Sequence, residues 1–280
     1  MRPAHAKVNL WLNVVGRRAD GYHLLDSLVA FADLADALEV APSDSLTLTV
    51  RGPWAAHLES ESDNLVLKAA RLLAERAGVA PRAALGLTKT IPVAAGLGGG
   101  SADAAAALRA LAAMWRIAVP EQSLFSLAEQ LGADVPMCFG GRTAIASGVG
   151  ERLGPAPSLP DCGLLLVNPG VPVATAEVFA ARQGPFSRAQ VVEGVWGDLA
   201  ALVAALAARG NDLQAPAIRL RPAIGEVLSF LARSDGVRYV AMSGSGATCF
   251  ALYDSIAAAQ QVALEVPGGW WRHAGRFVSG

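Results

Sequence analysis

The sequence predicts an α/β fold made of two domains. Segments with the period-two alternation of strands take turns with segments of helical spacing along the 280 residues. A chain of this length can build one large or two moderate domains. From Gly148 to Leu159 it becomes rich in Gly, Pro and Ser, which is typical of a domain boundary. We therefore expect one domain over residues 1–155 and another over residues 156–280.

The first expected strand covers residues 6–14. Apolar residues alternate there with Lys7, Asn9, Trp11 and Asn13, so that Lys7 and Asn9 lie side by side on a mostly polar face. Asp20-Gly21 is typical of a turn. The other expected elements, in chain order, are a strand over 46–50, a helix over 63–77, a strand over 85–90, helices over 101–115 and 121–131, a strand over 163–168, helices near 190–208 and 216–232, and a strand–turn–strand over 237–253.

Charge and cysteine content narrow the class of protein. A net charge of −1 gives no electrostatic footprint for nucleic acid or an anionic membrane, so we expect neither as a partner. Cys138, Cys162 and Cys249 have no zinc or redox spacing and are expected to be buried thiols in a reducing compartment. The N-terminus has no apolar secretory segment, and no stretch is long enough to span a membrane. We therefore expect a cytoplasmic protein.

The most informative segment is the glycine-rich loop of residues 91–101, which precedes an alanine-rich helix. Glycine allows close approach of the backbone to a ligand, and a helix N-terminus attracts anions. Ser101 is placed to cap the helix, and its hydroxyl could face a phosphate or a metal. The loop lacks the Gly-Lys-Ser/Thr ending of a Walker loop and does not fit G-x-G-x-x-G. We interpret it as a phosphate cradle; the alternative is a loop that only packs a helix.

Asp134 is the best candidate for a general base. It is a single carboxylate among apolar residues, and phosphoryl transfer to an alcohol uses an Asp to accept the hydroxyl proton. A nearby lysine would keep it ionised, and Lys7 is a suitable partner. The alternatives are a helix-cap or turn aspartate and a surface lysine.

A second Gly-rich segment, Ser243 to Thr248, lies between two apolar alternating runs and is predicted to be a hairpin turn. It could also supply a second set of backbone amides that close over phosphates or substrate.

Together these segments resemble the GHMP small-molecule kinase superfamily. The matching pieces, in the family's order, are Ala6–Leu10, Arg18–His23, Asp63–Leu65, Lys89–Pro92, the glycine-rich loop, Gly132–Pro136, Asn211–Leu213 and Gly244–Gly246. The segments Asp20–His23 and Gly132–Pro136 narrow the resemblance to the branch whose substrate is a cytidine diphosphate-linked methylerythritol.

The resemblance implies a two-domain GHMP kinase fold with the active site between the domains. The N-terminal, ATP-binding domain would be similar to the second domain of ribosomal protein S5, with a left-handed β-α-β crossover, and the C-terminal domain would be ferredoxin-like. ATP and Mg²⁺ would be the cofactors and a small molecule the substrate, and we expect a monomer or weak homodimer.

The resemblance also implies roles for individual residues. Asp134 is similar to the family's catalytic base, and Lys7 to the lysine that pairs with it. The implied ATP-binding residues are Pro92, Val93, Ala94, Ala95, Gly96, Leu97, Gly98, Gly99, Gly100 and Ser101 for the phosphates, with Asn64, Leu65 and Lys89 for adenine and ribose. The implied substrate-binding residues are Asn9, Tyr22, His23, Thr175, Phe179, Gly244, Ser245 and Gly246.

The resemblance leaves open the Mg²⁺ ligand and two alternative functions. The Glu with which many superfamily members hold Mg²⁺ has no counterpart in the motifs, so Ser101 and the phosphates would hold the ion, with Asp103 a weaker candidate. A GHMP kinase for another alcohol, of the homoserine or mevalonate type, is one alternative, and Tyr22 and His23 argue against it. A catalytically silent nucleotide- or sugar-binding relative is another, and the presence of both Lys7 and Asp134 argues against it.

Overall fold

The computed structural model describes residues 1–58, 64–118, 120–190, 192 and 194–278. Asp63, which begins one of the motif pieces, lies outside these ranges. The chain forms two compact units, each built from several segments. The first unit comprises Met1–Ala6, Leu34–Val93 and Gly98–Gly141, and the second comprises Lys7–Asp33, Ala94–Leu97 and Arg142–Gly280. The family-domain boundary at residue 155 stays a prediction.

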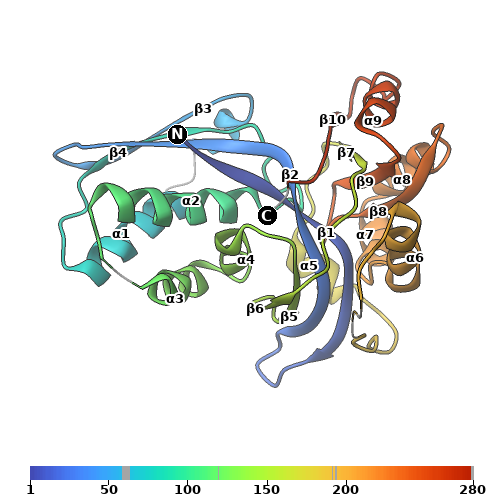
Figure 1. Cartoon of the computed structure of the whole chain (residues 1–280), viewed down its shortest axis with the longest axis horizontal. Coiled ribbons are helices and arrows are strands. Elements are labelled where there is room, and N and C mark those ends of the chain that lie inside the picture. Colours follow the sequence, from blue (N-terminus) through green and yellow to red (C-terminus); the bar gives the residue numbers. More distant parts are fainter. Residues whose placement is uncertain (59–63, 119, 191, 193, 279–280) are drawn as a thin grey trace. The chain divides into compact units, whose positions relative to one another are not determined.

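In the first unit, helices gather on one face of a small sheet (Figure 1). Strand β3 (Leu46–Arg51) pairs in parallel with β4 (Ala83–Thr88), and β4 pairs antiparallel with the end of β2 (His23–Ala41). The parallel pair is joined by the expected crossover helix; the handedness of this crossover stays a prediction. The helical elements of this unit are η1 (Ala55–His57), α1 (Leu65–Ala77), α2 (Gly99–Met114), α3 (Glu121–Leu131) and α4 (Val135–Gly140).

Helix α2 forms the centre of the first core. Its many alanines are buried on nearly every side, and their small side chains let α1, α3 and α4 pack closely around it. The helix begins two residues earlier than predicted, with Gly98 as its N-cap at φ +63°. The prediction that Ser101 caps α2 is therefore wrong, because Gly98 adopts the left-handed conformation there and Ser101 falls inside the first turn.

The second unit contains most of β1 (Arg2–Arg17), the first half of β2, β5 (Ala144–Gly148) and β6 (Arg152–Pro155). β5 pairs antiparallel with both β2 and β6. The predicted turn between β1 and β2 is confirmed, since Gly21 has φ +93° and its N–H donates to the carbonyl of Arg18 at 3.0 Å.

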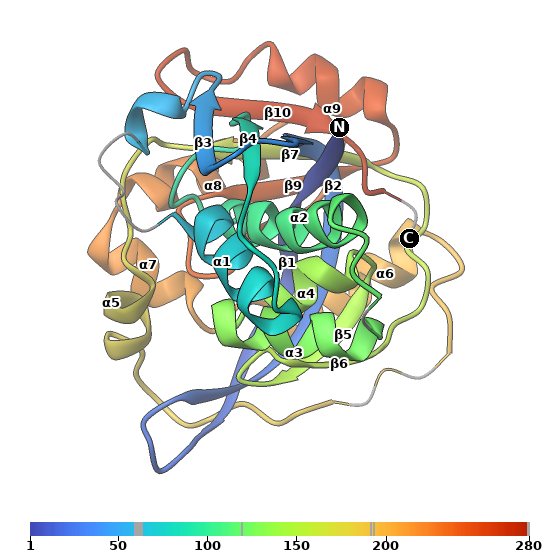
Figure 2. The same cartoon turned by 90° about the vertical axis from the view of Figure 1, so that its left-hand side faces the viewer.

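The rest of the second unit has the predicted ferredoxin-like arrangement. Strands β7 (Gly163–Asn168), β8 (Val237–Met242), β9 (Cys249–Tyr253) and β10 (Trp271–Gly275) form an antiparallel sheet in the order β10-β7-β9-β8. Taken with the helices between them, this is the β-α-β-β-α-β pattern. The helices are α5 (Thr175–Ala180), α6 (Leu199–Arg209), α7 (Gln214–Leu220), α8 (Ala223–Ala232) and α9 (Ile256–Ala263). Figure 2 shows α9 beside β10.

Two other predicted helices differ more strongly from their expected bounds. The helix expected over 216–232 is broken into α7 and α8, because Pro222 has no N–H to donate and disfavours a helical conformation at Arg221. The helix expected near 190–208 begins only at Leu199, where the Asp198 side chain accepts the N–H of Ala201 at 2.8 Å.

Two of the three cysteines are buried as predicted, Cys162 and Cys249, whereas Cys138 is half-buried. Burial raises the pKa of the Cys162 thiol to about 11. In the described part of the chain, no helix is both long and apolar enough to cross a membrane.

Candidate active site

Only residues 94–97 of the glycine-rich loop belong to the second unit; residues 91–93 and 98–101 belong to the first, where Gly98 to Ser101 form an anion-type site. The first intrahelical hydrogen bond of α2 runs from the N–H of Ala102 to the carbonyl of Gly98 at 2.9 Å. The N–H groups of Gly99, Gly100 and Ser101 precede that bond, so they have no acceptor within the helix. Together with the helix dipole they are suited to hold a phosphate.

The first half of the loop, Ala94 to Leu97, is held by the second unit. The N–H of Thr248 donates to the carbonyl of Ala95 at 3.2 Å, and the Ser243 hydroxyl donates to that of Gly96 at 3.2 Å. Gly96 has φ +75°, and a Cβ on it would lie 2.6 Å from the carbonyl oxygen of Gly246. Only glycine fits at this position, since any side chain would collide with backbone.

Residues 243–248 form the predicted turn between β8 and β9. The N–H of Ser243 donates to the carbonyl of Thr248 at 2.9 Å, and Gly244 has φ +57°. Asn211, from the matching Asn-Asp-Leu piece, donates from Nδ2 to the carbonyl oxygens of Met242 and Gly244 at 2.7 and 2.9 Å. This side chain was not predicted as part of the site, and it fixes the turn that packs against Gly96.

Asn64 and Leu65 stand at the start of α1 in the first unit. Asn64 is the N-cap, and its Oδ1 accepts the N–H of Val66 at 2.9 Å. A Cβ on Gly100 would be 3.7 Å from Cδ1 of Leu65, so Leu65 lies beside the first turn of α2. Both residues are thus close to the anion-type site, although the Asn64 oxygen is already used within the protein.

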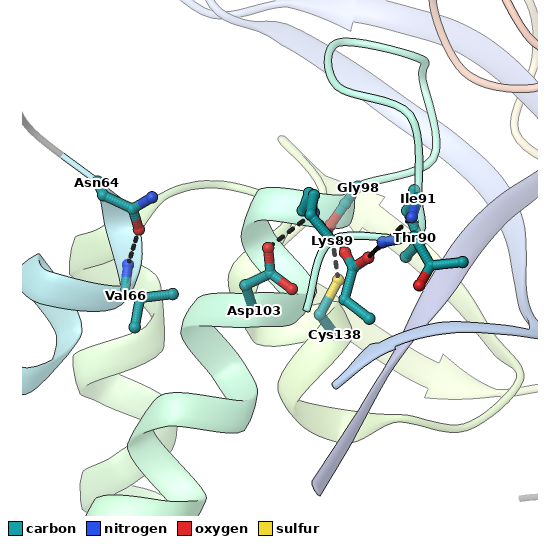
Figure 3. A network of polar contacts seen from close by, with 9 residues as sticks. Asn64, Val66, Lys89, Thr90, Ile91, Gly98, Asp103 and Cys138 are labelled. Atoms are coloured by element: carbon teal, nitrogen blue, oxygen red, sulfur yellow. Dashed lines mark hydrogen bonds and ion pairs between the residues drawn. The ribbon is translucent and has the colours of Figure 1, made fainter. Parts of the chain in front are cut away.

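Lys89 is buried, only 2% exposed, with its ammonium between two carboxylates (Figure 3). Nζ bonds to Asp36 and, at 2.7 Å, to Oδ2 of Asp103 on α2. Burial raises the pKa of Asp103 to about 7. The ammonium of Lys89 opposes this rise, and the second carboxyl group, that of Asp36, adds to it. Sequence reasoning missed Asp36, although in a strand it shares a face with Leu34 and Leu38, and a charge on an apolar face is a signal for a buried ion pair.

Asp134 immediately precedes α4, in the same unit as the anion-type site. It is half-buried, and Pro136 stands in the first turn that follows it. One turn further on, Cys138 directs its thiol toward the carbonyl of Gly98 at 3.9 Å (Figure 3). The helix that starts at Asp134 therefore packs against the start of α2.

Lys7 and Asn9 are both buried on β1, in the second unit. The backbone N–H of Lys7 donates to the carbonyl of Leu97 at 2.8 Å. Asn9 donates from Nδ2 to the Ser27 hydroxyl at 2.8 Å, while its Oδ1 accepts no hydrogen bond from the described residues. A Cβ on Gly244 would lie 3.2 Å from that oxygen. The second unit thus presents a buried acceptor beside the Gly244 turn.

The predicted cytidine-binding residues also meet within the second unit. The rings of His23 and Phe179 stack with centroids 4.9 Å apart and planes at 20°, while Tyr22 is 61% exposed. Desolvation lowers the pKa of His23, with smaller contributions from the charges of Arg17 and Arg182, which favours the neutral imidazole. The hydroxyl groups of Thr175 and Ser245 are 2.9 Å apart. Flat rings and hydroxyls are suited to a nucleobase and its sugar.

Comparison with known proteins places these features in a family. The model of the GHMP kinases N terminal domain matches residues 64–142, and that of the GHMP kinases C terminal matches residues 187–270. Two relatives have the name 4-diphosphocytidyl-2-C-methyl-D-erythritol kinase. The protein from Paramagnetospirillum magneticum is 52% identical over 99% of this chain and 98% of its own, and that from Rhodospirillum rubrum is 51% identical over 98% and 91%.

A solved structure gives the same result. The crystal structure of a 4-(cytidine 5'-diphospho)-2C-methyl-D-erythritol kinase superposes with a TM-score of 0.82 at 40% identity, and the match covers 100% of this chain and 99% of that one.

Proposed function

This chain belongs to the GHMP kinases, in the family of 4-diphosphocytidyl-2-C-methyl-D-erythritol kinases, and we propose that its substrate is the alcohol 4-diphosphocytidyl-2-C-methyl-D-erythritol. The γ-phosphoryl group of ATP goes to the 2-hydroxyl, and the products are the 2-phosphate and ADP. This is a step of the non-mevalonate route to isoprenoid precursors.

The observation that carries the choice of acceptor is the ring pair of His23 and Phe179. The two rings, from the start of β2 and from α5, stack at 4.9 Å, and Tyr22, which precedes His23 in the chain, is exposed. A kinase for a small aliphatic alcohol has no use for such rings. Stacking of one base on an aromatic side chain is worth about 1–3 kcal/mol, which supports a cytidine handle.

In the proposed reaction, the amides of Gly99, Gly100 and Ser101 hold the phosphates and Asp134 accepts the proton of the 2-hydroxyl. The acceptor oxygen forms a bond to the γ-phosphorus as the bond from that phosphorus to the β,γ-bridging oxygen breaks. Lys7 would keep Asp134 ionised. The binding energy of the remote cytidine would orient the hydroxyl for transfer.

Mg²⁺ is proposed to arrive with the nucleotide. Among the described residues, no group of three or more His, Cys, Asp or Glu side chains could hold a metal ion. Mg²⁺ does not need such a group, because it keeps several waters and is usually held by one or two protein oxygens plus phosphates. Ser101, half-buried in the first turn of α2, would supply the protein oxygen; bound Mg²⁺ would neutralise charge on the phosphates. Asp103 is a poorer ligand because one of its oxygens is bound to Lys89.

We also propose where the protein acts and in which oligomeric state. A cytoplasmic location fits a kinase that draws on ATP and a cytidine diphosphate-linked metabolite. A monomer or weak homodimer is the proposed state, and the substrate is a small molecule.

The test is a coupled assay of ADP release with four alcohols at equal concentration. They are the cytidylyl methylerythritol, methylerythritol phosphate, homoserine and mevalonate phosphate. We expect by far the fastest turnover with the first, and ³¹P spectra should show a new phosphate ester on its 2-oxygen. Faster turnover of homoserine or mevalonate phosphate would contradict the proposed acceptor. The absence of ADP release with all four would contradict a kinase.

A further inference from the structure

Three charged side chains are buried directly behind the anion-type site of the first unit. Lys89 and Asp103 are each 2% exposed and Asp36 is fully buried, so they are out of reach of a nucleotide in solution. Burying charges is costly, and such groups persist where they bind one another. The resemblance assigns only Lys89, and assigns it to adenine and ribose.

The cluster connects three segments of the unit. Asp36 comes from β2 and accepts, at Oδ1, the backbone N–H groups of Thr90 and Ile91 at 2.5 and 2.8 Å. Its Oδ2 binds the ammonium of Lys89, which follows β4. The same ammonium binds Asp103, five residues into α2. Lys89 therefore links the sheet to the first turns of α2, and the carboxyl groups of Asp36 and Asp103 lie close enough to interact with each other.

Gly99 shows how closely the lysine approaches the helix start. A Cβ on Gly99 would lie 2.9 Å from Nζ of Lys89 and 3.2 Å from Cγ2 of Ile91. The ammonium thus lies directly against the first residue of α2, whose N–H is one of the three that have no acceptor within the helix.

The charge of the cluster argues against attraction of phosphate as its task. One ammonium and two carboxylates sum to −1, and protonation of one carboxyl brings the sum only to zero. The lysine cannot therefore supply net positive charge to the triphosphate. What it can supply is a fixed position for the start of α2.

We infer that the side chain of Lys89, held by Asp36 and Asp103, positions the phosphate-binding amides of α2 and does not contact the nucleotide. This inference rests on the proposed use of ATP. It assigns to Asp36 and Asp103 a task in nucleotide binding that acts through Lys89, and it limits the assignment of Lys89 to adenine and ribose to the backbone of that residue.

The experiment compares Asp103→Leu with Asp103→Asn. Leucine has the branched shape of aspartate but is larger and cannot accept from Lys89, whereas asparagine has nearly the same volume as aspartate and its oxygen can accept. Calorimetry, or competition where binding is weak, gives the affinities of ATP, ADP and adenosine for each full-length variant. We expect Asp103→Leu to weaken ATP and ADP about tenfold, to leave adenosine within about twofold of the parent, and Asp103→Asn to restore the affinity for ATP.

A control separates positioning from loss of stability. Leu111→Ala creates a cavity in the same helix, away from the cluster, and should lower Tm without a phosphate-selective loss. If Leu111→Ala reproduced the selective loss, the inference would be overturned, because any weakening of α2 would then suffice. If Asp103→Leu does not fold, Gly99→Ala displaces the ammonium from the opposite side and should give the same selective loss.

Other outcomes have equally direct consequences. Equal weakening of adenosine and ATP would mean that the cluster contacts the nucleoside and would overturn the inference, as would parental ATP affinity in Asp103→Leu. Asp103→Asn as weak as Asp103→Leu would exclude the hydrogen bond as the link. A parent protein that binds no ATP would contradict the proposed function as well, whereas the variant patterns leave that function untouched.

Discussion

The two groups of predicted ligand-binding side chains differ in how the protein uses them. In the first unit, Asn64 caps α1 and Lys89 is buried between two carboxylates. In the second unit, His23 and Phe179 stack on each other and Tyr22 is mostly exposed. The two side chains of the first unit thus bind other protein groups, whereas in the second unit Tyr22 leaves most of its surface exposed.

The difference fits the proposed ligands. A phosphate is well bound by backbone N–H groups at a helix start, so side chains there can serve to place the backbone. A base offers two flat faces, on which aromatic rings stack. Substitutions in the Lys89 cluster should therefore act through the start of α2, and substitutions of the rings should act on the ligand directly.

The largest expected effect lies outside both groups. Asp134→Asn should lower kcat by about 10²–10⁴-fold, the usual contribution of a positioned general base, with both substrates still bound. Lys7→Met should also lower kcat, and the double variant should be little worse than the more impaired single one if the two act as a unit. Steady-state kinetics and ATP calorimetry measure this. A kcat within a few-fold of the parent in Asp134→Asn would exclude Asp134 as the base.

The next effect concerns the aromatic residues Phe179 and Tyr22. Phe179→Ala should raise KM for the cytidylyl substrate about 5- to 150-fold, which corresponds to about 1–3 kcal/mol of stacking, with ATP affinity within about twofold. Tyr22→Ala should act in the same direction. Phe186, exposed and farther along the chain, gives a matched control in Phe186→Ala. Unchanged KM in both ring variants would mean that the rings only pack on each other.

A smaller effect tests the side chain that caps α1. Asn64→Ala should destabilise the protein by about 0.5–2 kcal/mol, because the N–H of Val66 loses its acceptor. Asn64→Asp keeps the cap and removes the amide donor, so it should retain stability while weakening ATP if the amide reaches the nucleotide. Denaturant unfolding and calorimetry separate the two tasks. Parental ATP affinity in Asn64→Asp would limit Asn64 to the cap.

The last expected effect, on stability alone, is a pH dependence in the buried cluster. Burial raises the pKa of Asp103 from 3.8 to about 7, so the folded state holds a proton that the unfolded chain releases between these values. This carboxyl therefore disfavours folding increasingly as pH rises from about 4 to 7. The Tm of Asp103→Asn relative to the parent should be higher at pH 8 than at pH 4.5. A difference independent of pH, or one equal to that of the exposed Asp44→Asn, would contradict this.

The sequence could predict the features that depend on neighbours along the chain. A short, continuous apolar run located β7 to the residue, and glycines marked the turn at Gly21 and the loop before α2. The break at Pro222 was available from the same kind of signal. The start of α2 was not, because it depends on the left-handed conformation of Gly98.

What the sequence could not predict depends on contacts between distant residues. The carboxylate that binds the Lys89 ammonium belongs to Asp36, which is 53 residues away in sequence. Likewise, nothing local indicates that Asn211 holds the Gly244 turn. Burial and pairing of polar side chains are properties of the folded unit, so motif resemblance can name such a residue and still leave its task open.

In the proposed reaction, the cytidine binds to the rings of the second unit, and its binding energy orients the acceptor hydroxyl for transfer. The most direct test is kcat/KM in a two-by-two design: the cytidylyl substrate and methylerythritol phosphate, each with the parent and with Phe179→Ala. We predict that removing cytidine lowers kcat as well as affinity in the parent, and that Phe179→Ala affects only the cytidylyl substrate. Equal effects of Phe179→Ala on both acceptors would contradict the account.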